Sequence, residues 1–157
     1  MCLAFDDLYV KKTVQLKKRQ KTMRCYKMFE VLLVSAKIVT PFHSKDIILT
    51  DKSEFVSDRE SIELTSSELY ALSVNQGIHV YTSKEMAEVQ IKFFGLPNFF
   101  IPVTCKTEDL MVLGDCSCAV FTKIKINKKL LISAGKKAAR NYNKKYRSYY
   151  NVSNVGI

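Results

Sequence analysis

Residues 75–94 carry the fullest set of start and stop features for secondary structure in the chain, and they restrict the fold more than any other stretch. Asn75-Gln76-Gly77 is typical of a turn, and the apolar run 78–81 predicts a strand. Thr82 and Glu85 have the spacing of a capping box, in which each side chain satisfies a free backbone N–H of the other. A helix is therefore expected over 83–94.

A second strand is expected after this helix. Gly95-Leu96-Pro97 ends the helix, and the apolar segment 99–105 predicts a strand with Pro102 at a sheet edge or a bulge. Helical spacing puts four residues on one side of the helix, and this side is expected to lie on the sheet: Met86, Val89, Gln90 and Phe93.

Other segments add short elements to a small sheet. Residues 25–34 predict a buried strand, and residues 35–42 are expected to continue extended because Pro41 restricts the residue before it. Further expected elements are short strands at 47–49 and 55–56, a short helix around 67–70, a turn at 108–113 between the cap Thr107 and Gly114, and a strand with one wet face at 119–126.

The last expected element is a basic helix over 128–150. Its apolar face at about 100° per residue comprises Leu130, Leu131, Ala134, Ala138, Tyr142, Tyr146 and Tyr149. The opposite face comprises Lys136, Arg140, Lys144 and Arg147. Gly135 costs about 1 kcal/mol relative to alanine inside a helix, so this is where the helix would break most easily.

These elements predict the α+β class, with a small mixed or antiparallel sheet, one central helix and a C-terminal basic amphipathic helix. The expected organisation is a basic N-terminal segment (1–24), an α+β core (25–127) and a basic, tyrosine-rich C-terminal arm (128–157). A chain of 157 residues fits one such domain.

The net charge of +10 is concentrated at the two ends of the chain. Residues 1–24 hold seven basic and two acidic residues, 25–115 hold eight and thirteen, and 116–157 hold ten basic residues and no acidic one. This asymmetry points to an anionic partner, namely nucleic acid, an acidic protein face or a membrane surface, although charge also serves solubility. The longest apolar run, 31–34, is too short for a membrane span. The expected partner is DNA, RNA or an acidic host protein, and not a membrane.

The candidate contact residues are basic and aromatic residues at these two ends. They are Lys17, Lys18 and Arg19 near the N-terminus, and Lys136, Arg140, Lys144, Arg147, Tyr142 and Tyr146 in the arm. Lysine and arginine neutralise phosphates, and tyrosine rings stack on bases. The alternative is that the tyrosines pack on the sheet while the lysines stay solvated.

No metal, cofactor or catalytic residue is expected. The five cysteines, Cys2, Cys25, Cys105, Cys116 and Cys118, are odd in number and irregularly spaced, which favours free thiols in a reducing cytoplasm. A single C-x-C lacks the paired knuckles of a structural zinc site, and the sequence has no phosphate-cradling loop or nucleophile elbow. A signal peptide is not expected, because residues 1–24 lack a continuous apolar segment.

Several short motifs resemble small uncharacterised proteins encoded by phages and prophages. They are Met1-Cys2-Leu3, Tyr26-Lys27-Met28-Phe29, Gly77-Ile78-His79 and Lys123-Ile124-Lys125-Ile126. The resemblance covers about residues 23–127. It implies a viral or mobile-element accessory protein, in the host cytoplasm or in a virion, and carries no known activity.

Residues 77–83 also resemble a segment of ADP-ribosyltransferase-like folds, in which a strand leads into a helix beneath the nicotinamide pocket. This resemblance implies a candidate ligand pocket at Gly77, His79 and Tyr81. Catalysis in that class needs a late glutamate, and this chain has no carboxylate side chain after Asp115. The resemblance therefore implies a degenerate nucleotide-binding domain rather than an active transferase.

The sequence as a whole predicts a non-enzymatic accessory protein that binds an anionic partner through its basic ends. Two alternatives stay open. One is the degenerate transferase-like domain, and the other is a structural virion component whose basic arm docks on a neighbouring subunit.

Overall fold

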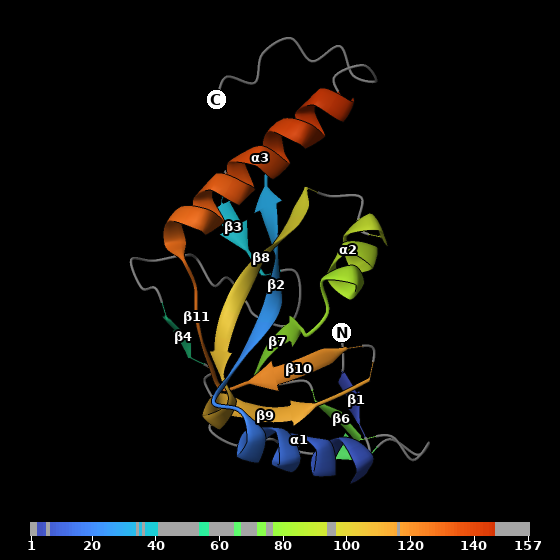
Figure 1. Ribbon diagram of the computed structural model, residues 1–157. Helices are drawn as coiled ribbons and strands as arrows, with labels where there is room; N and C mark the ends of the chain where they lie inside the picture. The colour runs from blue at the N-terminus through green and yellow to red at the C-terminus, as the bar shows by residue number, and fades with distance from the viewer. Residues whose placement is uncertain are drawn as a thin grey trace.

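The computed structural model describes residues 3–5, 7–33, 35, 37–40, 54–56, 65–66, 72–74, 77–93, 97–115 and 117–146. Its elements are β1 (Leu3–Phe5), α1 (Asp7–Arg19), β2 (Thr22–Leu32), β3 (Lys37–Val39), β4 (Glu54–Val56), β5 (Thr65–Ser66), β6 (Leu72–Val74), β7 (Ile78–Tyr81), α2 (Lys84–Phe93), β8 (Asn98–Lys106), the 3-10 helix η1 (Thr107–Asp109), β9 (Leu110–Leu113), β10 (Cys118–Phe121), β11 (Lys123–Lys125) and α3 (Lys128–Tyr146). Helices and antiparallel strands occur together, so the predicted α+β class is confirmed (Figure 1).

Six strands form one antiparallel sheet around the long strand β2. One edge of β2 pairs with β8 continuously, from Thr22 opposite Lys106 to Glu30 opposite Asn98. The other edge meets β7 only at Tyr26 and then pairs with β3, while β10 and β9 continue the sheet beyond β7. In Figure 1, β2 and β8 run upright while β9 and β10 cross below them, as expected for a strongly twisted sheet. The smaller groups are β1-β6-β5 and β11-β4.

The sheet buries apolar side chains on both faces. On β2, Phe29 and Val31 belong to one core cluster together with Leu131 of α3, whereas Met28 belongs to a second cluster with Ala87 of α2. α3 therefore covers one face of the sheet, and α2 covers part of the other. β10 contributes to both clusters, and all four of its residues are buried.

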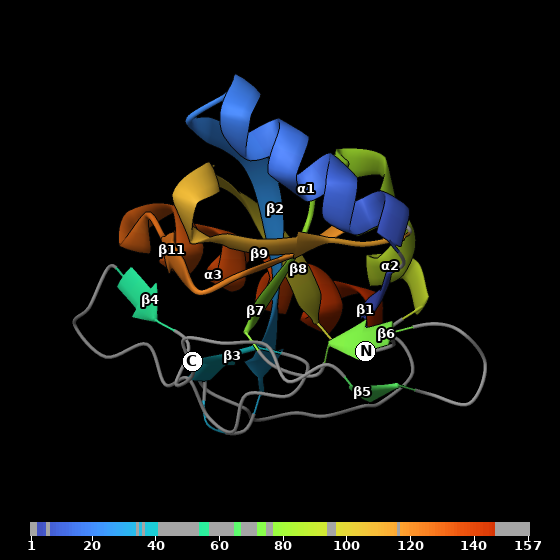
Figure 2. The same cartoon turned by 90° about the horizontal axis from the view of Figure 1, so that it is seen from below.

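Helix α1 lies in a segment expected only to be a basic lead-in, and it covers the outer edge of β9 (Figures 1 and 2). Thr13 is buried at this contact, where its hydroxyl accepts a hydrogen bond from the N–H of Leu113 at 2.9 Å. The same hydroxyl donates to the carbonyl of Tyr9 at 2.7 Å. A helix that covers an edge strand removes a site for unwanted strand pairing, so α1 is part of the packed fold.

The helix predicted over 83–94 is confirmed as α2, but its cap differs from the prediction. The N–H of Met86 donates to the hydroxyl of Ser83 at 3.3 Å, which makes Ser83 the cap. The hydroxyl of Thr82 instead donates to the carbonyl of Ser117 at 3.0 Å. The predicted capping box at Thr82 and Glu85 is wrong by one residue, because a tertiary contact uses the threonine.

The predicted buried side of α2 is right for Met86 but wrong for Val89 and Phe93. Ala87 is fully buried, with Met86 and Ile91 packed beside it against the second core cluster, whereas Val89 is exposed and Phe93 is 76% exposed. Apolar spacing fixes which residues share a side, but the connection from β7 fixes how the helix is rotated on the sheet.

Residues 119–126 do not form one strand. β10 ends at Phe121, and β11 leaves the sheet to pair with β4. The chain turns at Thr122, whose N–H and hydroxyl both donate to the carbonyl of Asp109, at 2.9 and 3.3 Å. The expected solvent-exposed face is absent from β10, whose four residues are all buried. It is present on β11, where Ile124 is buried between two more accessible lysines.

The remaining predicted strands and turns agree with the structure in part. The strands at 25–34, 55–56, 78–81 and 99–105 are confirmed as β2, β4, β7 and β8, and β8 pairs with β2 alone among the described residues, as Pro102 indicates for an edge. Residues 110–113 form β9 rather than part of a turn, and Thr107 donates its hydroxyl to the carbonyl of Gln20 instead of capping it. Within 35–42, the expected extended structure is confirmed for Lys37–Val39, which form β3 and run back antiparallel to β2, while residues 36, 41 and 42 lie outside the described residues. The predictions at 47–49 and 67–70 lie outside the described residues.

Helix α3 is confirmed from Lys128 to Tyr146 and continues through Gly135 without a break. Gly135 is buried, and a Cβ there would lie 2.7 Å from the Cδ1 of Ile38 and 3.4 Å from the ring of Phe99. The glycine therefore lets the helix approach the sheet closely.

The predicted apolar face of α3 is confirmed over its first half. Leu131 is fully buried, and Ala134 and Ala138 pack against the same cluster, whereas Leu130 is exposed.

Candidate functional site

The outer face of α3 carries a row of exposed cations. Asn127 caps the helix, since its side-chain oxygen accepts a hydrogen bond from the N–H of Leu130 at 3.0 Å. Lys136, Arg140 and Lys144 are exposed and follow one another at intervals of four residues, about 6 Å along the axis. The helix contains seven basic residues and no acidic one. Nothing on the helix itself therefore neutralises this row.

Two tyrosines occupy the last turns of α3. The rings of Tyr142 and Tyr146 lie 4.5 Å apart, centroid to centroid, and the ammonium of Lys145 lies 5.4 Å from the centroid of the second ring. Both tyrosines are half-buried, and neither belongs to the two core clusters. Figure 1 shows these turns extending beyond the ends of β2 and β8. The tyrosines thus pack on each other rather than in the core, and they stay partly accessible.

The basic residues of α1 lie far from this row. Lys17, Lys18 and Arg19 form the exposed last turn of α1, where positive charge suits the helix dipole. α1 precedes the start of β2, whereas α3 packs near the other end of that strand, and Figure 1 shows the two helices at opposite ends of the molecule. The fold does not bring the two predicted basic sites together. Arg147 lies outside the described residues.

The predicted ligand pocket at Gly77, His79 and Tyr81 is filled by protein. Gly77 has a φ of +84°, and a Cβ there would lie 2.5 Å from Val120. Tyr81 is buried in the second core cluster, and the carbonyl of His79 accepts a hydrogen bond from Lys27. These residues shape the core around β7, and whether they also bind a ligand stays a prediction.

Lys27 is a buried cation that the sequence did not single out. Its Nζ donates to the carbonyl of His79 at 2.9 Å, where β2 and β7 separate beyond their single bridge at Tyr26. Burial lowers the pKa of Lys27 to about 8. The side chain bridges the opening between the two strands, so we assign it a structural role.

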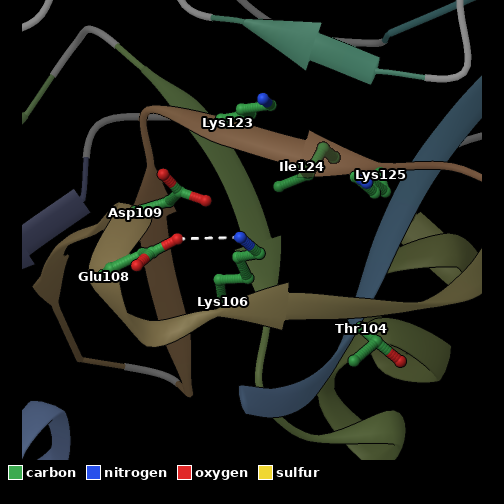
Figure 3. A pocket seen from close by; sticks show the side chains of 7 residues that line it. All are labelled: Thr104, Lys106, Glu108, Asp109, Lys123, Ile124 and Lys125. Atoms are coloured by element: carbon green, nitrogen blue, oxygen red, sulfur yellow. Dashed lines mark hydrogen bonds and ion pairs between the residues drawn. The ribbon is translucent and has the colours of Figure 1, made fainter. Parts of the chain in front are cut away.

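A small cavity of about 120 Å³ lies where β8, η1 and β11 meet (Figure 3). Its lining residues are Thr104, Lys106, Glu108, Asp109, Lys123, Ile124 and Lys125. The ammonium of Lys106 lies 2.9 Å from the carboxylate of Glu108, and this hydrogen bond lowers the pKa of that carboxyl. Three cations and two carboxylates leave the cavity with one net positive charge. The sequence did not predict this cavity, because its lining residues come together only through the packing of β8, η1 and β11.

The described cysteines are buried: Cys25, Cys105 and Cys118. A hydrogen bond with Cys105, together with burial, raises the pKa of the Cys25 thiol, which makes this thiol unreactive. Among the described residues there is no group of three or more metal-ligating side chains. Within the same part of the chain, no helix is long and apolar enough to cross a bilayer.

Comparison with known proteins finds no family model, no curated protein and no solved structure that the chain matches.

Proposed function

We propose that this protein binds nucleic acid through the exposed cationic face of α3. The observation that carries the proposal is the row Lys136, Arg140 and Lys144 on a helix that has no carboxylate. Binding of such a row to phosphates releases condensed counterions, which is the main source of sequence-independent affinity.

The energetics of the helix support an anionic ligand. Like charges four residues apart destabilise a helix by about 0.2–0.5 kcal/mol per pair. The row contains two such pairs, Lys136 with Arg140 and Arg140 with Lys144. A bound polyanion would neutralise these charges and remove their repulsion. The relief of this repulsion would add to the free energy of binding.

The tyrosines favour nucleic acid over an acidic protein surface. Tyr142 and Tyr146 lie on the same turns as Arg140 and Lys144 and stay partly accessible. Aromatic rings beside cations are the usual elements of surfaces that bind single strands. A role in a phage or mobile element agrees with the short motifs of the sequence and stays a prediction.

The test is a triple variant with a matched control. The variant Lys136→Ala, Arg140→Ala, Lys144→Ala removes the row. The control Lys11→Ala, Lys84→Ala, Lys92→Ala removes the same charge from exposed positions of α1 and α2. Binding of a labelled oligonucleotide is measured over a range of salt concentrations.

Each lost phosphate contact should flatten the log–log salt dependence by about 0.7–0.9, so the triple variant should lose about two to three units of slope. The control should keep the wild-type slope. Equal slopes in the two variants would contradict the proposal. A different result would favour a virion component or a ligand that is an acidic host protein. In that case the wild-type protein shifts neither DNA nor RNA but binds an assembly partner, and the triple variant no longer binds that partner.

A further inference from the structure

Among the described residues, no helix covers one half of the sheet face on the α2 side. α2 packs over Met28 and Phe100, which lie opposite each other in the upper part of β2 and β8. In the lower part the pairs are Arg24 opposite Thr104 and Thr22 opposite Lys106, and all four residues are exposed. Figure 1 shows α2 beside the upper part of this strand pair only.

An aromatic pair lies at the border between the covered and the open half. The rings of Tyr26 and Phe100 meet edge to face, 5.7 Å between centroids. The guanidinium of Arg24 lies 5.9 Å from the centroid of the Tyr26 ring. Both aromatic residues are half-buried. The open half therefore begins at the Tyr26 ring with the Arg24 guanidinium over it. A planar ligand group can stack on such a ring or guanidinium plane.

Further cations flank this half on the side of β8. Lys106 lies on the same face as Arg24, because the two residues belong to alternate positions of paired strands. Lys123 and Lys125 of β11 line the cavity together with Thr104 and Lys106, while Ile124 between them is buried in the core (Figure 3). Lys106 is paired with Glu108 at 2.9 Å, and Asp109 also lines the cavity, so the four cations Arg24, Lys106, Lys123 and Lys125 outnumber these carboxylates by two.

We propose that this surface, the sheet platform formed by Arg24, Tyr26, Phe100, Thr104 and Lys106, stacks unpaired bases of a single-stranded nucleic acid. Bases stack on tyrosine rings and on guanidinium planes, and lysines at the rim contact the phosphates. A duplex keeps its base faces stacked internally and cannot use the rings. The inference rests on the proposed function for the class of ligand, but it uses the opposite face of the sheet from α3.

The two surfaces are compatible with one bound strand. α3 covers the face of the Phe29 cluster, and the platform lies on the other face. β8 is the edge strand between these faces, and Lys123 and Lys125 lie beside that edge. A flexible single strand can pass around an edge, whereas a short duplex is too stiff to do so. The platform therefore adds a preference for single strands to the charge-driven binding of α3.

The experiment compares three ligands of equal phosphate number per strand: an oligothymidylate of about 15 nucleotides, the same strand without bases, and the corresponding duplex. The full chain and the variants Tyr26→Ala and Tyr26→Phe are titrated with each ligand. Tyr26→Ala should weaken binding of the oligothymidylate by about 5- to 150-fold and leave the abasic strand and the duplex unchanged. Tyr26→Phe keeps the ring and should retain wild-type affinity.

A second variant covers the case in which Tyr26→Ala does not fold. Thr104→Glu adds a negative charge at an exposed position of the platform and should weaken binding of the oligothymidylate more than binding of the duplex. Equal affinity of wild type for the oligothymidylate and the abasic strand would overturn the platform, and so would unchanged binding by Thr104→Glu. If the α3 triple variant has then lost its salt dependence, the proposed function stands without the platform. A base-dependent affinity that survives in the triple variant and disappears with Tyr26→Ala would instead support the platform and reject α3.

Discussion

The two faces of the β2–β8 strand pair differ in how completely they are covered. On one face, Phe29, Ile101 and Cys105 lie in one core cluster, and α3 packs closely over the Phe29–Phe99 end because Gly135 has no side chain. On the other face, α2 packs over the end near Met28, whereas Arg24 and Thr104 at the opposite end are exposed. The same strands thus have a closed face, on which we expect substitutions to change stability most, and a partly exposed face that carries the proposed sheet platform.

The closed face contains one unusual residue. Lys27 lies on the same side of β2 as Cys25 and Phe29, where an apolar residue is the rule. Its hydrogen bond to the carbonyl of His79 offsets only part of the cost of burying an ammonium. We therefore expect substitutions on the two faces to have different effects on the free energy of unfolding. Some should lower it strongly, one should raise it, and others should leave it nearly unchanged.

The largest effect is expected for Leu131, the fully buried residue of α3 on the closed face. Leu131→Ala should lower the free energy of unfolding by about 2–5 kcal/mol, through lost burial and the cavity left behind. The matched control is Leu130→Ala, whose side chain is 39% exposed and whose loss should be under about 1 kcal/mol. Urea denaturation measures both, and equal losses would show that α3 is not packed on this face.

Replacement of Lys27 should stabilise the protein. Lys27→Met removes a buried charge and fills the same space, so the free energy of unfolding should rise by about 1–3 kcal/mol at neutral pH. The pKa of about 8 lies below the ordinary 10.5, so the folded state loses this proton before the unfolded state does. Wild-type stability should therefore increase as pH rises from 8 to 10.5, and the advantage of the variant should fade.

This pH dependence is read from the difference between wild type and Lys27→Met, since all other groups titrate in both proteins. A difference that stays constant from pH 7 to pH 10.5 would mean that Lys27 keeps its ordinary pKa and is solvated.

A smaller effect tests the close contact between α3 and β3. Gly135→Ala gains about 1 kcal/mol of helix propensity but introduces a methyl group 2.7 Å from the Cδ1 of Ile38, so we expect a net loss of about 1 kcal/mol. In an Ile38→Val background the obstructing methyl group is gone, and the same change should become neutral or stabilising. Thermal or urea unfolding of the four proteins gives the coupling energy, and additive effects would place Gly135 away from Ile38.

The smallest effect is expected on the side of the sheet that α2 covers. Phe93→Ala removes a large side chain that is 76% exposed, and stability should change by less than about 0.5 kcal/mol. Ala87→Leu, at the fully buried position of the same helix, is the contrast and should cost about 1–3 kcal/mol by overpacking. If Phe93→Ala lowered the free energy of unfolding by several kcal/mol, Phe93 would be buried, and the side of α2 predicted from apolar spacing would lie on the sheet.

The sequence by itself determined most of the elements that have strong local features. The turn glycine, the strand β7, the helix α2 and the edge strand β8 follow from glycine, proline and apolar runs within one stretch, and α3 follows from its long basic and apolar periodicity. The row of cations on α3 was predictable as one side of a helix from its spacing, while the packing of Leu131 and Gly135 decides that this side faces solvent.

Tertiary structure decided everything that depends on contacts between distant residues. In α1 the apolar residues Leu8, Val10 and Val14 are exposed, so apolarity alone does not identify the buried side of this helix. The buried residue is Thr13, whose hydroxyl accepts a hydrogen bond from the N–H of Leu113, 100 residues away. The break at Thr122 depends on the carbonyl of Asp109.

The two proposed binding surfaces show the same division. The sheet platform arises only when β2 and β8 pair, because the pairing places Tyr26 beside Phe100 and Arg24 opposite Thr104. Burial of Lys27 depends equally on the opening between β2 and β7. Local spacing specifies which residues share a side of an element, but only the packed chain decides which side is covered and which is left to bind.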